Sequence, residues 1–269
     1  MARMAVTRRD VVYKTVDDAE LHVHVFEVEA RETEGPLPAI VFFFGGGWVG
    51  GSPEQFFPHC EYLASRGMVG ASAEYRVKNR HGTTPFECVR DGKSAVRWLR
   101  AHADELGIDP DRIAAGGGSA GGHVALCTAL IDDLDEPDED PGVSSKPNAL
   151  VLFNPVVDTT HPATRAARGG GAAERISPIH HVKRGDAPTI IFHGTADALV
   201  PIAEIERFCA EMKSAGNVCE LVVYEGQEHA FFNYRDGSNS YYAKTVSAAD
   251  RFLANLGWLE GEPTIREPP

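Results

Sequence analysis

Apolar and polar positions along the chain follow two alternating patterns, which predict strands that alternate with helices. Residues 39–44 form an uninterrupted apolar run, which is typical of a parallel strand covered on both faces. Between Thr84 and Gly107 the apolar residues recur every three or four positions, which predicts one long amphipathic helix. Strands and helices alternate in this way along most of the chain, so we predict a mostly parallel sheet with helices on both faces.

The chain begins differently, with a segment that alternates apolar and polar residues from Val11 to Val28 around Asp17 and Asp18. This pattern predicts an antiparallel hairpin at the edge of the sheet. We find no internal repeat and no linker composition, and 269 residues are enough to bury one large core. The expected organisation is therefore a single α/β domain over residues 1–269.

Two segments interrupt the alternation. Residues 132–141 contain seven acidic side chains in ten positions, and residues 158–186 are rich in Ala, Arg and Gly in their middle part. The acidic segment lacks the spacing and central glycine of an EF-hand calcium loop, so we interpret it as a solvated loop. A helix start is predicted directly after the glycines at 50 and 51, with Ser52 as N-cap, Pro53 at the first helical position and Gln55 completing a capping box.

The strongest chemical signal is Ser119, in the run Gly117-Gly118-Ser119-Ala120-Gly121. The run follows the apolar residues 113–115 and precedes a helical pattern, so it forms a G-x-S-x-G turn between a strand and a helix. Small neighbours allow the sharp turn, which projects the serine hydroxyl out of the sheet. A glycine-rich turn with a purely structural serine is the alternative for this motif taken alone.

Three other predicted strands end in residues that complement such a serine. Residues 39–44 are followed by three glycines and Trp48, residues 190–193 precede Asp197, and residues 222–224 precede His229. In this order of motifs the chain resembles the α/β-hydrolase superfamily, and within it short-chain esterases related to hormone-sensitive lipase and to acetyl-xylan and feruloyl esterases. The resemblance runs from about Val11 to Leu256. It implies the α/β-hydrolase fold, with residues 158–186 as a small cap or lid over the substrate.

The resemblance also assigns a catalytic triad. Ser119 is the expected nucleophile, His229 the general base and Asp197 the carboxylate that orients the histidine. Asp158, at the end of the preceding strand, is the rival for the acid, since some hydrolases place it there.

An oxyanion hole is expected beside the serine. The N–H of Ala120, the residue after the nucleophile, should supply one donor, and by resemblance Gly46 and Gly47 supply the others. The chain departs from the family's His-Gly-Gly-Gly motif because Phe44 stands in place of the histidine. That histidine ordinarily braces the loop, so the change bears on the loop's rigidity and not on its donors. Trp48 is the candidate wall of the acyl pocket.

These expectations define a serine hydrolase of carboxylic esters with short acyl groups, acetyl in the first place. Its expected substrates include acetyl esters of carbohydrates, and it is expected to need no metal or organic cofactor. The alternatives are a feruloyl-type esterase, a peptidase on the same fold, or a non-catalytic ligand-binding protein. His22 and His24 share one strand face and offer a metal-site hypothesis, without a third ligand in the sequence.

Composition limits the partners. The net charge of −13 disfavours nucleic acid and anionic membranes as partners. No apolar run reaches membrane-spanning length and the N-terminus lacks a signal-peptide core, so we expect a cytoplasmic protein, or a secreted one if a signal peptide has been removed. The cysteines form no C-x-x-C pair and are expected to be mostly buried free thiols: Cys60, Cys88, Cys127, Cys209 and Cys219.

Overall fold

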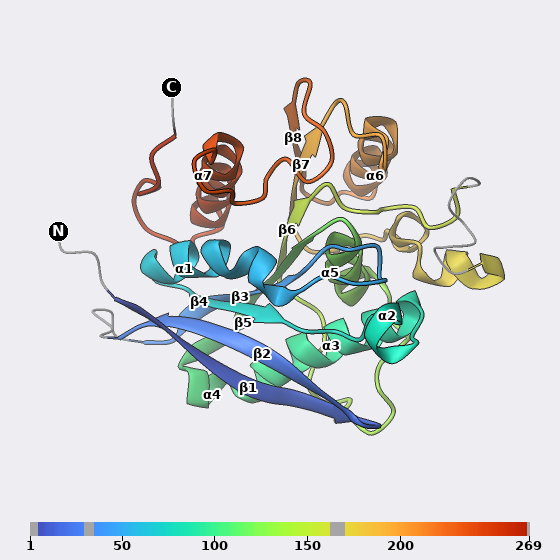
Figure 1. Cartoon of the computed structure of the whole chain (residues 1–269), viewed down its shortest axis with the longest axis horizontal. Helices are drawn as coiled ribbons and strands as arrows, with labels where there is room; N and C mark the ends of the chain where they lie inside the picture. The colour runs from blue at the N-terminus through green and yellow to red at the C-terminus, as the bar shows by residue number, and fades with distance from the viewer. Residues whose placement is uncertain (1–4, 30–34, 162–169, 268–269) are drawn as a thin grey trace.

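The computed structural model of the chain describes residues 5–29, 35–161 and 170–267. A twisted eight-stranded sheet runs through its centre in the order β1-β2-β4-β3-β5-β6-β7-β8 (Figure 1). The strands are β1 (Val6–Val16), β2 (Ala19–Val28), β3 (Leu37–Phe43), β4 (Val69–Ala73), β5 (Ile108–Gly118), β6 (Ala149–Phe153), β7 (Thr189–Gly194) and β8 (Cys219–Tyr224). Strands β1 and β2 form the expected hairpin, which pairs antiparallel with β4, and the remaining strand pairs are all parallel.

The connections between strands contain the helices. These are η1 (Pro53–Phe56), α1 (Phe57–Ser65), α2 (Lys78–His81), α3 (Pro85–Ala101), α4 (Ala103–Leu106), α5 (Ala120–Leu130), η2 (Gly170–Ile176), η3 (Pro178–His181), α6 (Ile202–Ser214) and α7 (Ser240–Asn255). The predicted helix from Thr84 to Gly107 is divided in two, because the chain leaves helical geometry at His102, whose ring donates to the Trp98 carbonyl.

The two larger of three hydrophobic cores among the described residues lie on opposite faces of the sheet, because successive side chains of a strand point to opposite faces. In β3, Val41 packs in the core shared with α3, α5 and α6, whereas Ile40 and Phe42 pack in the core shared with α1 and α7. Figure 1 shows α1 and α7 on one side of the sheet and α3 and α5 on the other. The predicted fold class is therefore confirmed. All five cysteines, each in the described part of the chain, are buried free thiols.

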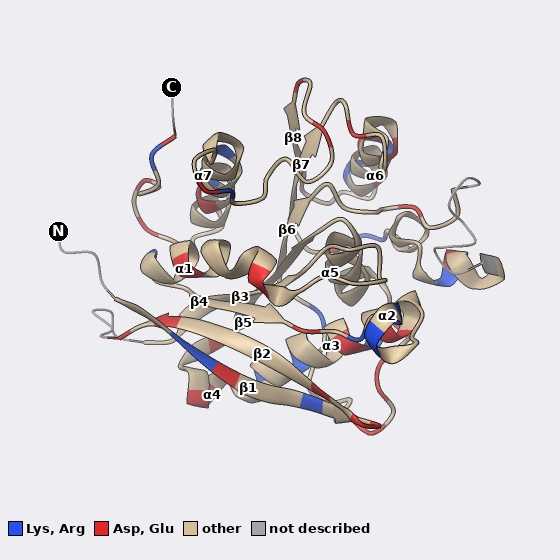
Figure 2. Ribbon diagram, viewed as in Figure 1, with Lys and Arg blue, Asp and Glu red and all other residues tan. Residues whose placement is uncertain are grey.

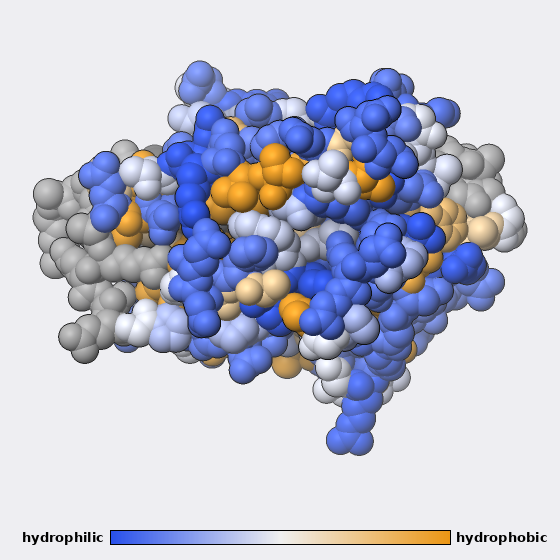
Figure 3. All heavy atoms as spheres, turned by 90° about the horizontal axis from the view of Figure 1, so that it is seen from below, coloured by the Kyte–Doolittle hydropathy of each residue, from blue (hydrophilic) through white to orange (hydrophobic). Residues whose placement is uncertain are grey.

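Acidic and basic residues are interspersed along β1 and α3 (Figure 2). The surface seen from below is mostly hydrophilic and contains a short apolar strip (Figure 3). Among the helices that the structure describes, none has both the length and the apolar composition needed to cross a bilayer. The middle of the predicted cap, residues 162–169, lies outside the described residues, and its flank from Gly170 to His181 forms η2 and η3.

One predicted helix start is wrong in its details. Ser52 makes no side-chain capping bond, and Gln55 does not complete a capping box. The Gln55 carboxamide instead accepts from the N–H of Gly45 at 2.6 Å and donates to Asn233 Oδ1 at 2.8 Å. A complete capping box occurs at the start of α3, between Thr84 and Glu87.

Candidate active site

Ser119 occupies the sharp turn between β5 and α5. Its backbone has φ 53° and ψ −118°, a left-handed conformation that a residue with a side chain rarely adopts. A Cβ on Gly117 would lie 2.5 Å from the Phe43 carbonyl oxygen, and one on Gly121 would lie 2.0 Å from the same atom. The glycines are therefore required by the close approach of β3, and the tight packing holds the strained turn in place.

The structure brings Ser119, His229 and Asp197 into one hydrogen-bonded chain. His229 Nε2 lies 2.9 Å from Ser119 Oγ, and His229 Nδ1 lies 2.7 Å from Asp197 Oδ2. The serine follows β5, the aspartate follows β7 and the histidine follows β8, so all three lie where the parallel strands end. An Nδ1–H that donates to the aspartate leaves Nε2 free to accept the serine proton.

Asp197 is held as a carboxylate. Its Oδ1 accepts from the N–H groups of Leu199 and Val200, each at 2.9 Å. Burial alone would raise the pKa of Asp197, but the hydrogen bonds from His229 and from these N–H groups outweigh burial and hold the pKa below its usual value. The group is therefore ionised at neutral pH and can fix the orientation of the imidazole.

Asp158, the rival for the acid, has other partners. Its carboxylate accepts from Thr160 at 2.7 Å and from Ser177 at 3.2 Å, and it pairs with Arg207 at 2.7 Å. These contacts tie the beginning of the cap segment to α6.

The glycine loop after β3 lies against the serine. A Cβ on Gly45 would be 3.5 Å from Ser119 Cβ. Gly46 and Gly47 have φ 129° and 62°, and among the described residues their N–H groups donate to no backbone carbonyl. Ala120 is the first residue of α5, so its N–H has no acceptor within the helix. The three predicted oxyanion donors are thus placed in two segments that meet at Ser119.

Phe44, which replaces the family histidine, is fully buried and braces this loop in another way. Its ring stacks on Tyr75 with centroids 4.1 Å apart, and the Tyr75 hydroxyl donates to the Phe44 carbonyl at 2.6 Å. The loop is thereby fixed by an aromatic stack and a hydrogen bond.

Trp48, the predicted wall of the acyl pocket, is buried and hydrogen-bonded to α5. Trp48 is only 6% exposed, and its indole N–H donates to His123 Nδ1 at 3.3 Å. His123 in turn donates through Nε2 to the Ile176 carbonyl at 2.6 Å. Trp48 therefore connects the glycine loop to α5 and to the cap flank, and its expected contact with the acyl group stays a prediction.

Two polar residues beside the triad were not singled out by sequence patterns for this site. Gln55 links the glycine loop to the histidine loop through the contacts given above. Asn154 follows β6 directly and places its carboxamide 3.4 Å from His229 Nε2. Both are single polar residues in loops or short turns, where sequence periodicity carries no signal.

The metal-site hypotheses find no structural support within the described ranges, where no group of three or more candidate ligands occurs. His22 lies 3.2 Å from Glu74, and His24 lies 2.8 Å from Asp10. Each histidine therefore has a carboxylate partner of its own.

The interpretation of residues 132–141 as a solvated loop is wrong for several of its side chains. Asp135 pairs with the buried Lys93 at 2.7 Å, and Glu136 pairs with the buried Lys14 at 2.6 Å. The acidic segment is anchored by basic side chains of α3 and β1.

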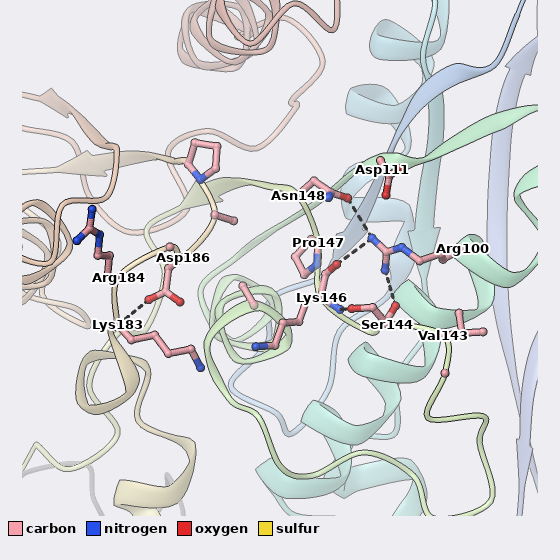
Figure 4. A pocket seen from close by; sticks show the side chains of 15 residues that line it. Arg100, Asp111, Val143, Ser144, Lys146, Pro147, Asn148, Lys183, Arg184 and Asp186 are labelled. Carbon is pink, nitrogen blue, oxygen red and sulfur yellow. Dashed lines mark hydrogen bonds between the residues drawn. The ribbon is translucent and has the colours of Figure 1, made fainter.

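A cavity of about 680 Å³ lies at the other end of the sheet, where the strands begin (Figure 4). Its polar groups largely bond to one another: Arg100 donates to the carbonyls of Pro110 and Lys146 and to Asn148 Oδ1. Ser119, Asp197 and His229 lie at the opposite end of the sheet, where the parallel strands end, so this cavity is separate from the triad.

Comparison with known proteins agrees with this geometry. Residues 28–212 match the family described as BD-FAE. LipM of Mycobacterium tuberculosis, described as a probable carboxylic ester hydrolase, is 29% identical over 259 residues, which cover 87% of this chain and 58% of LipM. The chain spans about half to two thirds of the length of the curated relatives that it matches.

Solved structures of esterase 2 from Thermogutta terrifontis are more similar. The form phosphorylated by paraoxon has a TM-score of 0.89 and 48% identity, covering 95% of this chain and 96% of that one. The butyrate-bound form has a TM-score of 0.90 and 46% identity, with the same coverage. The chain belongs to the BD-FAE family, and thereby to the α/β-hydrolase serine esterases of the hormone-sensitive-lipase-like type.

Proposed function

We propose that the chain hydrolyses carboxylic esters of short acyl groups, acetyl among them, through a covalent acyl-enzyme. The observation that carries the proposal is the hydrogen-bonded chain from Asp197 through His229 to Ser119. Beside the serine, the N–H groups of Gly46 and Gly47 donate to no backbone carbonyl in the part of the chain that the structure describes. The proposed roles are nucleophile for Ser119, general base for His229 and orienting carboxylate for Asp197.

In the proposed reaction, Ser119 Oγ attacks the ester carbonyl carbon while its proton passes to His229 Nε2. The carbonyl oxygen becomes an oxyanion, which the N–H groups of Gly46, Gly47 and Ala120 would stabilise. The bond to the alcohol oxygen then breaks, and Nε2 delivers its proton to that oxygen. Water repeats the sequence on the acyl-enzyme, so that the acid is released and Ser119 regains its proton.

We also propose that the acyl site accepts only short chains. Butyrate is bound in one related esterase structure and propionate in another, each at 46–47% identity, which supports a site for acyl groups of this size. We place Trp48 at the acyl side of the glycine loop. An overfilled pocket costs about 1–3 kcal/mol, so rates are expected to fall steeply beyond the acyl length that fits.

The test compares aryl esters from acetate to octanoate, beside acetylated xylan and a feruloyl ester. We expect kcat/KM to be highest for acetate, to fall several-fold by butyrate and to be negligible for octanoate. Ser119→Ala should lower kcat by roughly a millionfold. Octanoate hydrolysed as fast as acetate would contradict the short acyl site, and a Ser119→Ala variant with substantial activity would contradict the mechanism.

A further inference from the structure

Asn154 has an unusual backbone at a position next to the triad. It is fully buried, follows β6 directly and has φ 35°, and its N–H donates to the Phe192 carbonyl at 2.8 Å. Asparagine tolerates the left-handed region better than most residues, but the conformation still costs free energy. In this position the side chain reaches across to the histidine loop.

The orientation of the Asn154 carboxamide follows from its two neighbours. The N–H of Ala230, itself at φ 64°, donates to Asn154 Oδ1 at 3.0 Å. An N–H must face an oxygen, so the Oδ1 faces Ala230 and the Nδ2 group faces the imidazole. The Nδ2 lies 3.4 Å from His229 Nε2, the atom that also receives the Ser119 hydroxyl at 2.9 Å.

Two donors therefore face one ring nitrogen. An N–H group favours an Nε2 that carries a lone pair and disfavours one that carries a proton. Other charged or titratable groups lie near the ring. The Asp197 carboxylate at Nδ1 favours the protonated ring, and His193, on β7, lies 3.6 Å from the same carboxylate. Glu228, Arg235 and Tyr241 line a pocket together with His229. Burial lowers the pKa of His193, so it is a neutral neighbour at neutral pH.

We propose that Asn154 is a positioning residue that holds the imidazole of the general base with Nε2 aimed at Ser119. This inference rests on the proposed function, in which His229 is the base. Asn154 would act through His229 and would not touch the ester. Its second contact, to Ala230, fixes the backbone that follows His229, so one side chain positions both the ring of the base and the loop that carries it.

Asn154→Asp tests the inference because it is nearly isosteric and keeps an oxygen for the Ala230 N–H. A carboxylate at this place acts on the ring through its own charge, so the variant shows whether position 154 faces Nε2, and Asn154→Gly, which removes the donor without adding a charge, shows whether the native amide acts on the ring. The proposed role predicts that a carboxylate beside Nε2 stabilises the protonated ring, so the acid limb of kcat/KM moves to higher pH by about 1 to 2 units, with the rate recovering at alkaline pH. An unchanged acid limb would overturn the inference.

Asn217→Asp is the matched control. Asn217 also bridges backbone groups, accepting from Gly185 at 2.9 Å and donating to the Lys183 carbonyl at 2.8 Å. It lies before β8, at the end of the sheet where the parallel strands begin, whereas His229 follows β8. The pH profile of Asn217→Asp should match the wild type. Asn154→Gly carries the test of the native donor: glycine suits φ 35°, and loss of the donor should move the acid limb upward by a smaller step than Asn154→Asp does.

The proposed function fails separately from this inference. If His229→Gln retains the wild-type rate and acid limb, His229 is not the base and the proposed function is wrong. If His229→Gln abolishes the activity but the acid limb of both Asn154 variants coincides with that of the wild type, only the role of Asn154 is wrong.

Discussion

Asp197 illustrates how single residues define this site. Its carboxylate receives one hydrogen bond from His229 and two from the backbone of its own loop. The backbone donors stabilise the ionised form whatever the state of the histidine, so the orienting charge is built into the loop between β7 and α6. Asp158 has a comparable number of partners, but they belong to the cap segment and α6.

Replacing each aspartate by asparagine should separate these roles. Asp197→Asn is expected to lower kcat by roughly ten-thousandfold, because the amide permits the wrong histidine tautomer. Asp158→Asn should cost far less, since it only weakens the contact with Arg207. The measurement is kcat for an aryl acetate at neutral pH, and the reverse ranking would move the acid to the end of β6.

The pH profile should report the base and not the acid. The pKa of Asp197 is lowered, so this carboxyl stays ionised until well into the acid range and cannot cause a loss of activity near neutral pH. A histidine base ordinarily becomes protonated at roughly pH 6 to 7, and kcat/KM should fall there. A profile that is flat down to about pH 4 would contradict a histidine base. EDTA should have no effect on the rate.

At the scale of elements, the site depends on how η1 joins two loops that come from distant parts of the chain. The Gln55 side chain receives the Gly45 N–H and donates to Asn233, four residues after His229. It therefore sets the distance between the oxyanion loop and the histidine loop. Gly45 is also the residue whose added Cβ would touch Ser119.

Gln55→Leu should therefore impair catalysis without unfolding the protein. A displaced glycine loop misaligns the oxyanion donors, and a displacement of about 1 Å can cost roughly 100-fold, so we expect a loss of about 10- to 100-fold in kcat with a smaller change in KM. Ser52→Ala is the control, because Ser52 makes no side-chain capping bond in the same turn. Equal effects of the two substitutions would argue against the link.

The difference between prediction and structure also lies mostly at this scale. Strand-to-helix alternation was enough to predict a mostly parallel α/β fold, since periodicity is a local feature. The selection of Ser119, Asp197 and His229 depended on the resemblance of four strand-end motifs to those of a known superfamily. Gln55 and Asn154 escaped prediction because their partners lie 178 and 75 residues away. The ion pairs of Asp135 and Glu136 escaped for the same reason, since a charge run alone does not show which buried bases face it.

For the molecule as a whole, the core on the α1 and α7 face extends to the histidine loop, because Phe232, three residues after His229, packs in it. His59 lies in this core, 1% exposed, and neither of its ring nitrogens has a hydrogen-bond partner among the described residues. Aromatic rings surround it, with centroids between 4.9 and 6.1 Å away: Phe42, Phe56, Phe153, Phe232 and Tyr242. Burial lowers the pKa of His59 to about 3.

This buried histidine should make stability depend on pH. The folded protein keeps His59 neutral, whereas the unfolded chain protonates it near its ordinary pKa of about 6.5. Below that pH the unfolded state binds the extra proton, so the free energy of unfolding falls by up to about 1.4 kcal/mol per pH unit as the pH decreases toward 3. Above about pH 6.5 His59 is neutral in both the folded and the unfolded state, so its titration no longer lowers the free energy of unfolding.

His59→Phe should remove this dependence. Urea unfolding of wild type and variant near pH 7.5 and near pH 5 gives the two free energies. We expect the variant to lose less stability on acidification than the wild type, and to be at least as stable at the higher pH because two buried polar atoms without partners are gone. Parallel losses of stability in both proteins would show that His59 is not the source.

The central claim is that Ser119 is the nucleophile, and covalent labelling tests it most directly. Paraoxon phosphorylates the related esterase 2 of Thermogutta terrifontis. Wild-type protein would be treated with paraoxon, digested and analysed by mass spectrometry, beside Ser119→Ala. We expect one diethylphosphoryl group per chain on Ser119, loss of esterase activity in proportion to labelling, and no labelling of Ser119→Ala. A label on another residue that accompanies the loss of activity, or full inactivation without modification of Ser119, would contradict the account.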